Sequence, residues 1–449
     1  MKTARQYAIQ SRKNSEALRL ASMTANMRRN KAYRYAAERA RGDPDGRVLA
    51  QFIERFQAYR SGWRQNPKTA IEEKLHHEAF RRRGFPPLCV DLELAAICDL
   101  ACPFCFRQWI ATPDKLMRKE LALRILEQCA QLGVASIKLN WRGEPLMHPN
   151  LPEIIDRAKQ LGILETIINT NAVTLTEDKS RALIDAGLDM IIYSFDGGTK
   201  QTYEQMRVGR FKENRFEPVY ENIRRFATIR SEMGAVFPIT KIQMILTQET
   251  FGEQESFFRL FSDCVDDVSV KAYTERGGSL PDLDESLRRQ LQQVIQEKRL
   301  AEDAAYWRDM HGTLYLASGR LACEQPYQRM MVTYDGRVSM CCYDWGSEYP
   351  IGYVDEEAFR DGDAAYQAAM DKAQQQAKGF ELLGNIRMPR RYLEPPKRVE
   401  TLEQIWHGEI VNGVRQQHVE GRIDDVPICR RCPFKETYQW VAIDEPRTI

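Results

Sequence analysis

The sequence predicts an α/β fold whose core is a partial barrel of parallel strands. From residue 85 onward, strand-like apolar runs alternate with helical patterns such as residues 121–132 and 151–161. This order is typical of a parallel sheet with helical crossovers. Six such runs occur, whereas a closed barrel of this kind needs eight strands. The runs are residues 90–94, 135–140, 163–169, 190–195, 239–247 and 268–273.

The first 83 residues lack this alternation and are predicted to form a helical extension. Ala, Arg, Glu and Gln dominate them, and a Gly-Asp-Pro-Asp-Gly break at residues 42–46 separates two helices. The extension holds 20 Lys and Arg against 8 Asp and Glu, a charge of +12, while the remaining residues hold 45 against 55, a charge of −10. We expect a basic arm packed against an acidic body, and a site for an anionic partner is the alternative.

Beyond about residue 290 the strand and helix alternation ends and a second group of cysteines begins. We therefore expect three parts: the extension at 1–83, a core at 84–290, and a C-terminal domain at 291–449. Residues 353–378 are rich in Asp, Ala and Gln and are predicted to be a helical insertion in the last part.

The composition limits where the protein acts. At 449 residues, with 43% hydrophobic and 29% charged residues, the chain is long enough for two folded domains and an extension. No apolar run approaches the roughly 20 residues that span a bilayer, and the first residues lack the apolar segment of a signal peptide. We expect a cytoplasmic protein without a membrane partner, in which the 11 cysteines serve metal binding rather than disulfides.

Three cysteines follow the first predicted strand, at Cys98, Cys102 and Cys105. Three thiolates on one loop can hold three irons of a four-iron four-sulfur cluster and leave the fourth iron open. A zinc site would need a fourth ligand, and no further Cys or His lies within the motif. The C-x3-C-x2-C spacing, with an aromatic residue before the last cysteine, resembles the signature of the radical S-adenosylmethionine (SAM) superfamily. The resemblance implies that the amine and carboxylate of SAM chelate the open iron.

The turn after the second predicted strand resembles a SAM-binding motif of this family. Gly143-Glu144-Pro145 is similar to the GGEP-type motif, which implies a contact with the amino group of SAM. Arg142 stands where a first glycine is usual, so close backbone approach is expected only at Gly143.

The next two predicted strands also end in turns that resemble motifs of the family. Asn169 and Asn171 are similar to a TNG-type turn beside the cofactor. Ser194 and Asp196 are similar to an S-x-D-G element, which implies contacts with the ribose or the carboxylate of SAM. Carboxylates at strand ends are natural partners of ribose hydroxyls.

A second group of cysteines follows the predicted core. With the LGNI segment at 383–386 and a helix around Trp406, it resembles the SPASM domain or its shorter form, twitch. The full pattern has further cysteines after the C-x2-C pair, whereas this chain offers Tyr438. The resemblance implies one auxiliary four-iron four-sulfur cluster, and structural zinc is the alternative. The implied ligands are Cys323, Cys341 or Cys342, Cys429 and Cys432, with Cys341 in the register of the motif.

Two cysteines near the predicted sites are left without a metal. Cys342 stands beside the auxiliary ligands, and Cys264 precedes the sixth predicted strand. Either could donate a hydrogen atom to a substrate radical, as some radical SAM epimerases require. Ordinary packing is the alternative for both.

The resemblance implies a radical SAM enzyme, an oxidoreductase or an epimerase. A flavodoxin-type or ferredoxin-type reductant would supply one electron, which cleaves SAM and gives a 5'-deoxyadenosyl radical that takes hydrogen from the substrate. We expect a small-molecule substrate, a sugar, aminocyclitol or nucleotide-sugar, because a single auxiliary cluster resembles the twitch arrangement of aminocyclitol-oxidising enzymes. The alternatives are a maturase of a ribosomally made peptide and a non-catalytic metal-cluster scaffold that binds nucleic acid through the basic arm.

Overall fold

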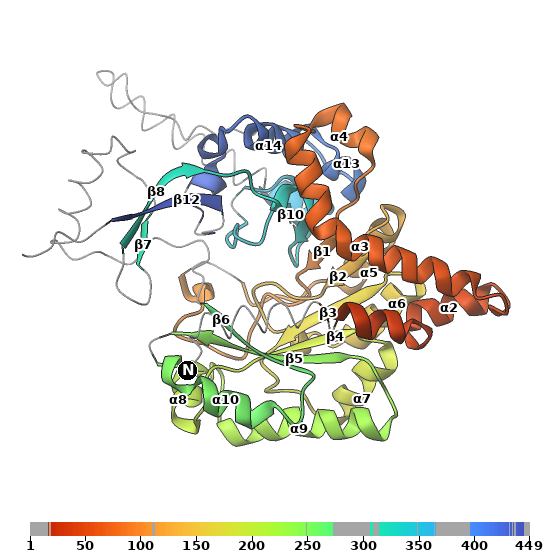
Figure 1. The fold of residues 1–449 in the computed structure, drawn as a ribbon, viewed down its shortest axis with the longest axis vertical. Helices are drawn as coiled ribbons and strands as arrows, with labels where there is room; N and C mark the ends of the chain where they lie inside the picture. Colours follow the sequence, from red (N-terminus) through yellow and green to blue (C-terminus); the bar gives the residue numbers. More distant parts are fainter. Residues whose placement is uncertain are drawn as a thin grey trace, which may run out of the picture.

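The computed structural model describes residues 17, 19–109, 113–247, 249–272, 306–308, 314–347, 349–362, 364, 396–430, 432, 434 and 437–443 (Figure 1). Of the predicted insertion, residues 356–362 are helical, and most of the remainder lies outside the described residues. The LGNI segment at 383–386 also lies outside them.

A nine-stranded sheet forms the centre of the structure, in the order β11-β10-β9-β1-β2-β3-β4-β5-β6. All neighbours from β9 to β6 pair in parallel, and β10 and β11 add antiparallel pairs beyond β9. The six predicted strands are β1 to β6, so the predicted α/β class is confirmed. Their bounds are β1 Cys89–Leu92, β2 Ser136–Lys138, β3 Glu165–Thr170, β4 Met190–Ser194, β5 Ile239–Leu246 and β6 Asp267–Ala272.

Helices connect the parallel strands and pack side by side, α5 on α6, α6 on α7 and α7 on α9. In α6, apolar residues recur three and four positions apart, and Leu151, Ile154, Ile155 and Ala158 are buried. The crossover helices are α5 Lys119–Gln131, α6 Leu151–Gln160, α7 Glu177–Ala186, α8 Lys200–Met206, α9 Phe216–Glu232 and α10 Gln254–Phe261. Short 3-10 turns are η2 Phe106–Trp109, η3 Pro145–Met147 and η4 Phe251–Glu253.

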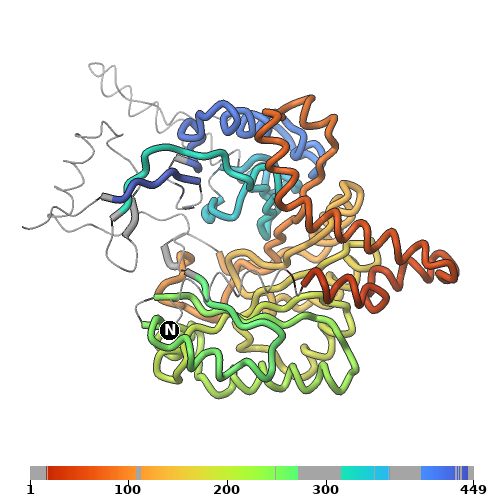
Figure 2. The backbone as a smooth tube through the Cα atoms, viewed as in Figure 1, coloured from red at the N-terminus to blue at the C-terminus, as the bar shows by residue number. Residues whose placement is uncertain are grey.

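The N-terminal extension is helical where it is described, and Figure 2 shows it doubling back beside the sheet. Its elements are η1 Met27–Arg29, α2 Lys31–Arg39, α3 Arg47–Glu72 and α4 His77–Arg83. Phe52 and Phe56 of α3 pack in one cluster with Leu164 and Ile239, which lie at the amino ends of β3 and β5. The extension therefore covers the amino ends of the central strands, opposite their carboxyl ends.

The C-terminal part both extends the central sheet and forms a second sheet of its own. β9 pairs with β1 over four residues, so the central sheet continues into this part. A second, antiparallel sheet has the order β12-β8-β7. The elements are β7 Tyr306–Arg308, β8 Leu314–Arg320, η5 Gln325–Tyr327, β9 Arg329–Val332, β10 Arg337–Ser339, β11 Gly352–Tyr353, α13 Leu402–Trp406, α14 Glu409–Val419, η6 Ile423–Asp425, α15 Pro427–Arg430 and β12 Tyr438–Ile443.

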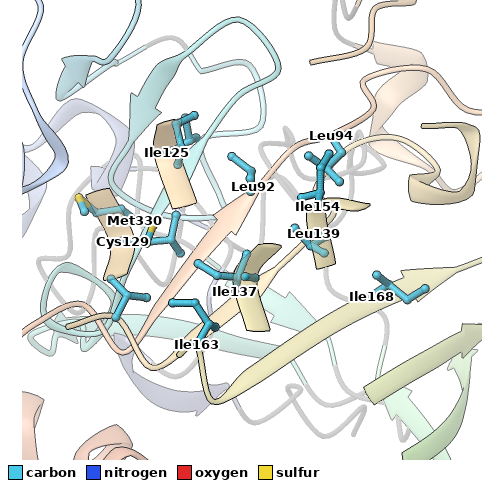
Figure 3. Packing of buried hydrophobic residues seen from close by; sticks show 14 of the residues in the cluster. Leu92, Leu94, Ile125, Cys129, Ile137, Leu139, Ile154, Ile163, Ile168 and Met330 are labelled. Atoms are coloured by element: carbon cyan, nitrogen blue, oxygen red, sulfur yellow. The ribbon is translucent and has the colours of Figure 1, made fainter. Parts of the chain in front are cut away.

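The main hydrophobic core lies between the central sheet and its crossover helices (Figure 3). Leu92, Ile137 and Ile168 extend from three adjacent strands, and Ile125 and Ile154 meet them from α5 and α6. Across the described residues, no helix has both the length and the apolar character that crossing a bilayer requires.

Candidate active site

A cavity of about 700 Å³ opens at the carboxyl ends of the central strands. The loop after β1 contributes the three cysteines of the first motif, and the turns after β2, β3 and β4 contribute polar groups. The C-terminal part closes another wall. The lining residues used below are Cys98, Cys102, Cys105, Trp141, Gly143, Glu144, Asn169, Asn171, Ser194, Arg207, Cys342 and Trp345.

The loop after β1 brings Cys98, Cys102 and Cys105 to this cavity. The Leu100 amide donates to Cys98 Sγ at 3.5 Å, and the Cys105 amide donates to the Cys102 carbonyl at 3.0 Å. Burial raises the pKa of Cys98, with a further contribution from Glu144, and raises the pKa of Cys102 to about 11. The Cys98 and Cys102 thiols are therefore protonated at neutral pH, and iron binding would release their protons.

The donor chemistry of this loop fits an iron-sulfur cluster with one open iron. Within the described residues, no three His, Cys, Asp or Glu side chains lie close enough to share a single metal ion. In a cluster, each thiolate binds its own iron. Among the same residues, the wall also holds a buried acceptor without a hydrogen-bond partner, Asn169 Oδ1. A polar ligand such as SAM would satisfy it.

Gly143 fits against the cysteine loop because it has no side chain. A Cβ atom at this position would lie 2.3 Å from the carbonyl oxygens of both Ala95 and Ile97. The adjacent Glu144 amide donates to Ile97 O at 2.9 Å. The close backbone approach expected at Gly143 therefore occurs, and its partner in this structure is the cysteine loop itself.

Glu144 joins the ends of β2 and β3. Its carboxylate accepts hydrogen bonds from Thr170 Oγ1 at 2.7 Å, the Asn171 amide at 2.8 Å and the Leu146 amide at 3.0 Å. Burial raises the pKa of Glu144 to about 7, and the charge of Asp99 adds to the shift. Its contact with the SAM amine stays a prediction. Pro145, predicted beside it, is buried as the first residue of η3.

The carboxyl ends of β3 and β4 place Asn169 and Ser194 in the cavity wall, and the turn after β3 adds Asn171, as their strand-end positions predict. Asn171 Nδ2 donates to Asp99 Oδ1 at 2.6 Å, which fixes the turn against the cysteine loop. The Asn169 amide donates to Asn140 Oδ1 at 2.9 Å.

Asp196 is not among the residues that line the cavity, and its contact with SAM stays a prediction. It is fully buried, accepts a hydrogen bond from the Ile245 amide at 2.6 Å, and forms an ion pair with Arg207. Arg207 does reach the wall, where its Nη1 lies 3.8 Å from Cys102 Sγ and its guanidinium lies 5.4 Å from the Phe104 ring centroid. The ion pair with Asp196 thus fixes Arg207 at the cavity wall.

Arg142 occupies the position of the missing glycine and ties the barrel to the C-terminal part. Its guanidinium makes two hydrogen bonds of 2.6 Å to the carboxylate of Glu93 and donates to Trp345 O at 3.0 Å. Both side chains of the pair are almost completely buried. This contact positions the segment that carries Cys342 and Trp345 beside the cavity.

The second group of cysteines gathers behind that segment. Burial raises the pKa of Cys341, and the nearby Cys342, Cys432 and Cys429 raise it further. Burial raises the pKa of Cys323 to about 12, with contributions from Cys432 and Cys342. All five cysteines are thus close in space, which is consistent with the predicted ligand set but leaves Cys341 and Cys342 as alternatives.

The sheet β12-β8-β7 holds the C-x2-C pair in place. Arg320 of β8 donates to Cys429 O at 2.9 Å and to the hydroxyl of Tyr438 at 3.1 Å. Tyr438 of β12 donates to Cys432 O at 2.7 Å. Tyr438, where the full SPASM pattern has further cysteines, thus supports the backbone of the last ligand pair.

The two predicted hydrogen donors lie in different places. Cys342 lines the cavity beside Trp141 and Trp345. Cys264 lies before β6, at the amino end of the sheet, where its Sγ donates to Phe261 O at 3.6 Å. Because the cavity lies at the carboxyl ends of the strands, the structure does not bring Cys264 to the site, and its prediction as a donor is corrected.

Three residues of the site have no motif that would reveal them in the sequence. Arg207 forms an ion pair with Asp196, and Glu93 forms an ion pair with Arg142. His418 lies between two of the auxiliary cysteines. Of these three residues, only Glu93 has a signal in the sequence. It is a charged residue at the end of the first predicted strand, and a buried charge requires a partner of opposite charge.

Comparison with family models defines the class of the two sites. Residues 92–246 match the Radical SAM superfamily, and residues 323–375 match SPASM, an iron-sulfur cluster-binding domain. The chain therefore contains one segment that matches the Radical SAM superfamily and a later segment that matches a SPASM domain. A radical SAM domain binds a four-iron four-sulfur cluster and SAM, and a SPASM domain binds auxiliary iron-sulfur clusters. Cys429 and Cys432 follow the matched SPASM segment.

Individual relatives match parts of the chain. The protein named "Probable GTP 3',8-cyclase" of Methanothermobacter marburgensis is 35% identical over 127 residues, 28% of this chain and 40% of that protein. A PqqA peptide cyclase of Gluconobacter oxydans is 37% identical over 133 residues, 28% of this chain and 35% of that protein. The chain therefore spans less than half the length of either relative.

Two solved structures align with parts of this chain at low identity and with low TM-scores. BtrN in complex with AdoMet and 2-DOIA aligns with 79% of this chain and 95% of its own, at 15% identity and a TM-score of 0.42. Streptococcus suis SuiB bound to the precursor peptide SuiA aligns with 60% of this chain and 66% of its own, at 16% identity and a TM-score of 0.43.

Proposed function

We propose that this radical SAM enzyme closes a ring or cross-link in a ribosomally made peptide. The observation that carries the proposal is the cavity that joins the three-cysteine loop to Cys342 of the SPASM segment. The identity to a PqqA peptide cyclase adds support for a peptide substrate. The comparisons favour this alternative over the small molecule expected from the sequence.

The cysteines of the two motifs define two candidate metal sites. We propose that Cys98, Cys102 and Cys105 hold the cluster that binds SAM, and that Cys323, Cys341, Cys429 and Cys432 hold one auxiliary cluster. Cys341 is preferred over Cys342 because it is buried within the main core together with Cys429, whereas Cys342 faces the cavity. We propose that the chain has three domains, at residues 1–83, 84–290 and 291–449. The central sheet contains strands from both the second and the third of these domains, because β9 pairs with β1.

The chain's own residues would bind SAM and orient it. Glu144, Asn169, Asn171 and Ser194 present polar groups to the cavity, and Arg207 brings a cation beside Cys102. When bound and reduced, SAM supplies a 5'-deoxyadenosyl radical that takes hydrogen from a substrate carbon. The aromatic wall around Trp141 and Trp345 would exclude water from that step.

A first experiment tests the enzyme class. After anaerobic reconstitution and dithionite reduction, the wild type should convert SAM to 5'-deoxyadenosine, and Cys98→Ala should abolish the conversion. Cys341→Ala should keep this activity in the absence of substrate and lose about four irons per chain. A reconstituted wild type that neither binds nor cleaves SAM would support the scaffold alternative instead.

A second experiment tests the substrate. Candidate peptides, GTP and aminocyclitols are incubated with the reduced enzyme in deuterated water, and products are analysed by mass spectrometry. Ring closure in a peptide should remove two hydrogens and add no solvent deuterium to carbon. Deuterium incorporation at unchanged composition would favour epimerisation with Cys342 as the hydrogen donor.

A small-molecule substrate is the second candidate. The cavity volume of about 700 Å³ lies within the range of ordinary small-molecule pockets. One of the matched relatives is named as a cyclase of GTP. Turnover of GTP or an aminocyclitol in the panel, without turnover of any peptide, would establish this candidate. The reductant, a flavodoxin or a ferredoxin, is proposed in either case.

A further inference from the structure

His418 lies between two of the proposed auxiliary ligands. It is on α14, is 2% exposed, and was not singled out by any sequence motif. The Cys323 amide donates to His418 Nδ1 at 3.0 Å, and His418 Nε2 lies 3.5 Å from Cys429 Sγ. One imidazole ring therefore connects the first cysteine of the auxiliary set with the C-x2-C pair.

The hydrogen-bond geometry determines which ring nitrogen carries the proton. An amide N–H can only donate, so Nδ1 must offer a lone pair to Cys323. The single proton of the neutral ring is then on Nε2, which faces the sulfur of Cys429.

Cys429 differs from the other proposed ligands in its sulfur contact. Within the described residues, backbone amides meet the other sulfurs, from Gln325 at Cys323, Tyr343 at Cys341 and Phe434 at Cys432. At Cys429 the contact comes from a side chain. A side chain can be exchanged without altering the backbone, so this contact can be tested alone.

The ring is held rigidly in this position. Arg415, one turn earlier on α14, is fully buried and donates to Trp406 O at 2.7 Å and to Pro326 O at 3.1 Å. Pro326 belongs to η5, which begins two residues after Cys323. The helix and the Cys323 turn are therefore fixed to each other, and His418 has little freedom to turn away.

We propose that His418 is a positioning residue that donates a hydrogen bond from Nε2 to the Cys429 thiolate and raises the reduction potential of the auxiliary cluster. The inference rests on the proposed assignment of Cys323 and Cys429 as ligands. A hydrogen bond to a ligating sulfur stabilises the more negatively charged, reduced state of a cluster. A higher potential makes the cluster a better acceptor for the electron that ring closure must release.

Two substitutions separate the two contacts of the ring. In His418→Asn, the amide oxygen can replace Nδ1 and accept from Cys323, but no donor reaches Cys429. In His418→Gln, the longer side chain places an N–H near the position of Nε2. Both are measured in a background of Cys98→Ala, Cys102→Ala and Cys105→Ala, in which only the auxiliary cluster can form.

Redox titration followed by electron paramagnetic resonance gives the readout. The Asn variant should have a lower midpoint potential than the parent with an unchanged iron content, and the Gln variant should recover most of the difference. His407→Asn, in a half-buried histidine whose ring packs on Phe80, is the control and should leave the potential unchanged.

The outcomes distinguish this inference from the proposed function. A parent variant without iron would show that the auxiliary cluster assignment fails. A parent with about four irons, but equal potentials in all variants, would overturn the role of His418 alone. Loss of iron in both the Asn and Gln variants, at an unchanged fold by circular dichroism, would also overturn it, because His418 would then be a ligand.

Discussion

At the scale of single residues, Gly143 is the position where the smallest change should have the largest effect. In Gly143→Ala, the new methyl group would meet two backbone carbonyls at 2.3 Å, so the cysteine loop or the β2 turn must shift. We expect the variant to lose most of its first-cluster iron and its SAM cleavage. Gly252→Ala, where a Cβ has no neighbour within 4 Å, is the control and should match the wild type.

Glu144 should make the stability of the metal-free protein depend on pH. Its folded pKa of about 7 exceeds the usual 4.5 because the carboxyl is buried. The stabilising contribution of the neutral carboxyl is complete below pH 4.5 and is lost as pH rises through 7. The loss is about 3 kcal/mol.

Urea unfolding at pH 5 and pH 8 measures this contribution. Between the two pH values, the free energy of unfolding should fall by about 2.5 kcal/mol more in the wild type than in Glu144→Gln, because part of the contribution is already lost at pH 5. An equal fall in both proteins would show that Glu144 ionises normally in the folded state.

The sequence predicts those site residues whose signal is local. Cys98, Gly143 and Ser194 stand at strand ends within short motifs, and the structure places all three in one cavity. It does not predict the ion pair of Asp196 with Arg207, because that pairing depends on how α8 returns to β4. The contact of His418 with Cys323 spans 95 positions and likewise has no local signal.

At the scale of elements, α3 should contribute to stability through its buried face. Phe56 is fully buried in the cluster that covers the amino ends of the strands. Phe56→Ala should therefore lower the free energy of unfolding by about 3–5 kcal/mol. Gln51→Ala, on the exposed face of the same helix, should change it by less than about 0.5 kcal/mol. Equal effects of the two changes would contradict this packing.

The same contrast between local and distant signals holds for elements. β1 to β6 are predictable because each is a compact apolar run followed by a helix with a regular apolar face. β9, β10 and β11 are as short as β1 and β2 or shorter, and in the described residues no helix with a regular apolar face separates them. The pairing of β9 with β1 joins segments 240 positions apart, so the continuous sheet emerges only from the folded chain.

At the scale of the whole molecule, the ion pair of Glu93 and Arg142 joins the barrel to the C-terminal part. Arg142→Met would leave the Glu93 carboxylate buried without its cation and remove the bond to Trp345 O. Loss of one partner of a buried pair costs about 3–5 kcal/mol. We expect thermal unfolding by calorimetry to begin at a lower temperature and to separate into two transitions, because the C-terminal part loses its tie to the barrel.

Two further variants test whether the effect of Arg142→Met comes from the unpaired charge of Glu93 or from the lost hydrogen bond to Trp345 O. Arg398→Met removes a largely exposed arginine and should leave a single transition. The double variant Glu93→Leu with Arg142→Met removes the unpaired charge and should recover most of the free energy of unfolding. It should not recover SAM-dependent turnover of substrate, because the bond that positions Trp345 and Cys342 at the cavity is still missing. Full recovery of both stability and turnover would show that the pair serves stability alone.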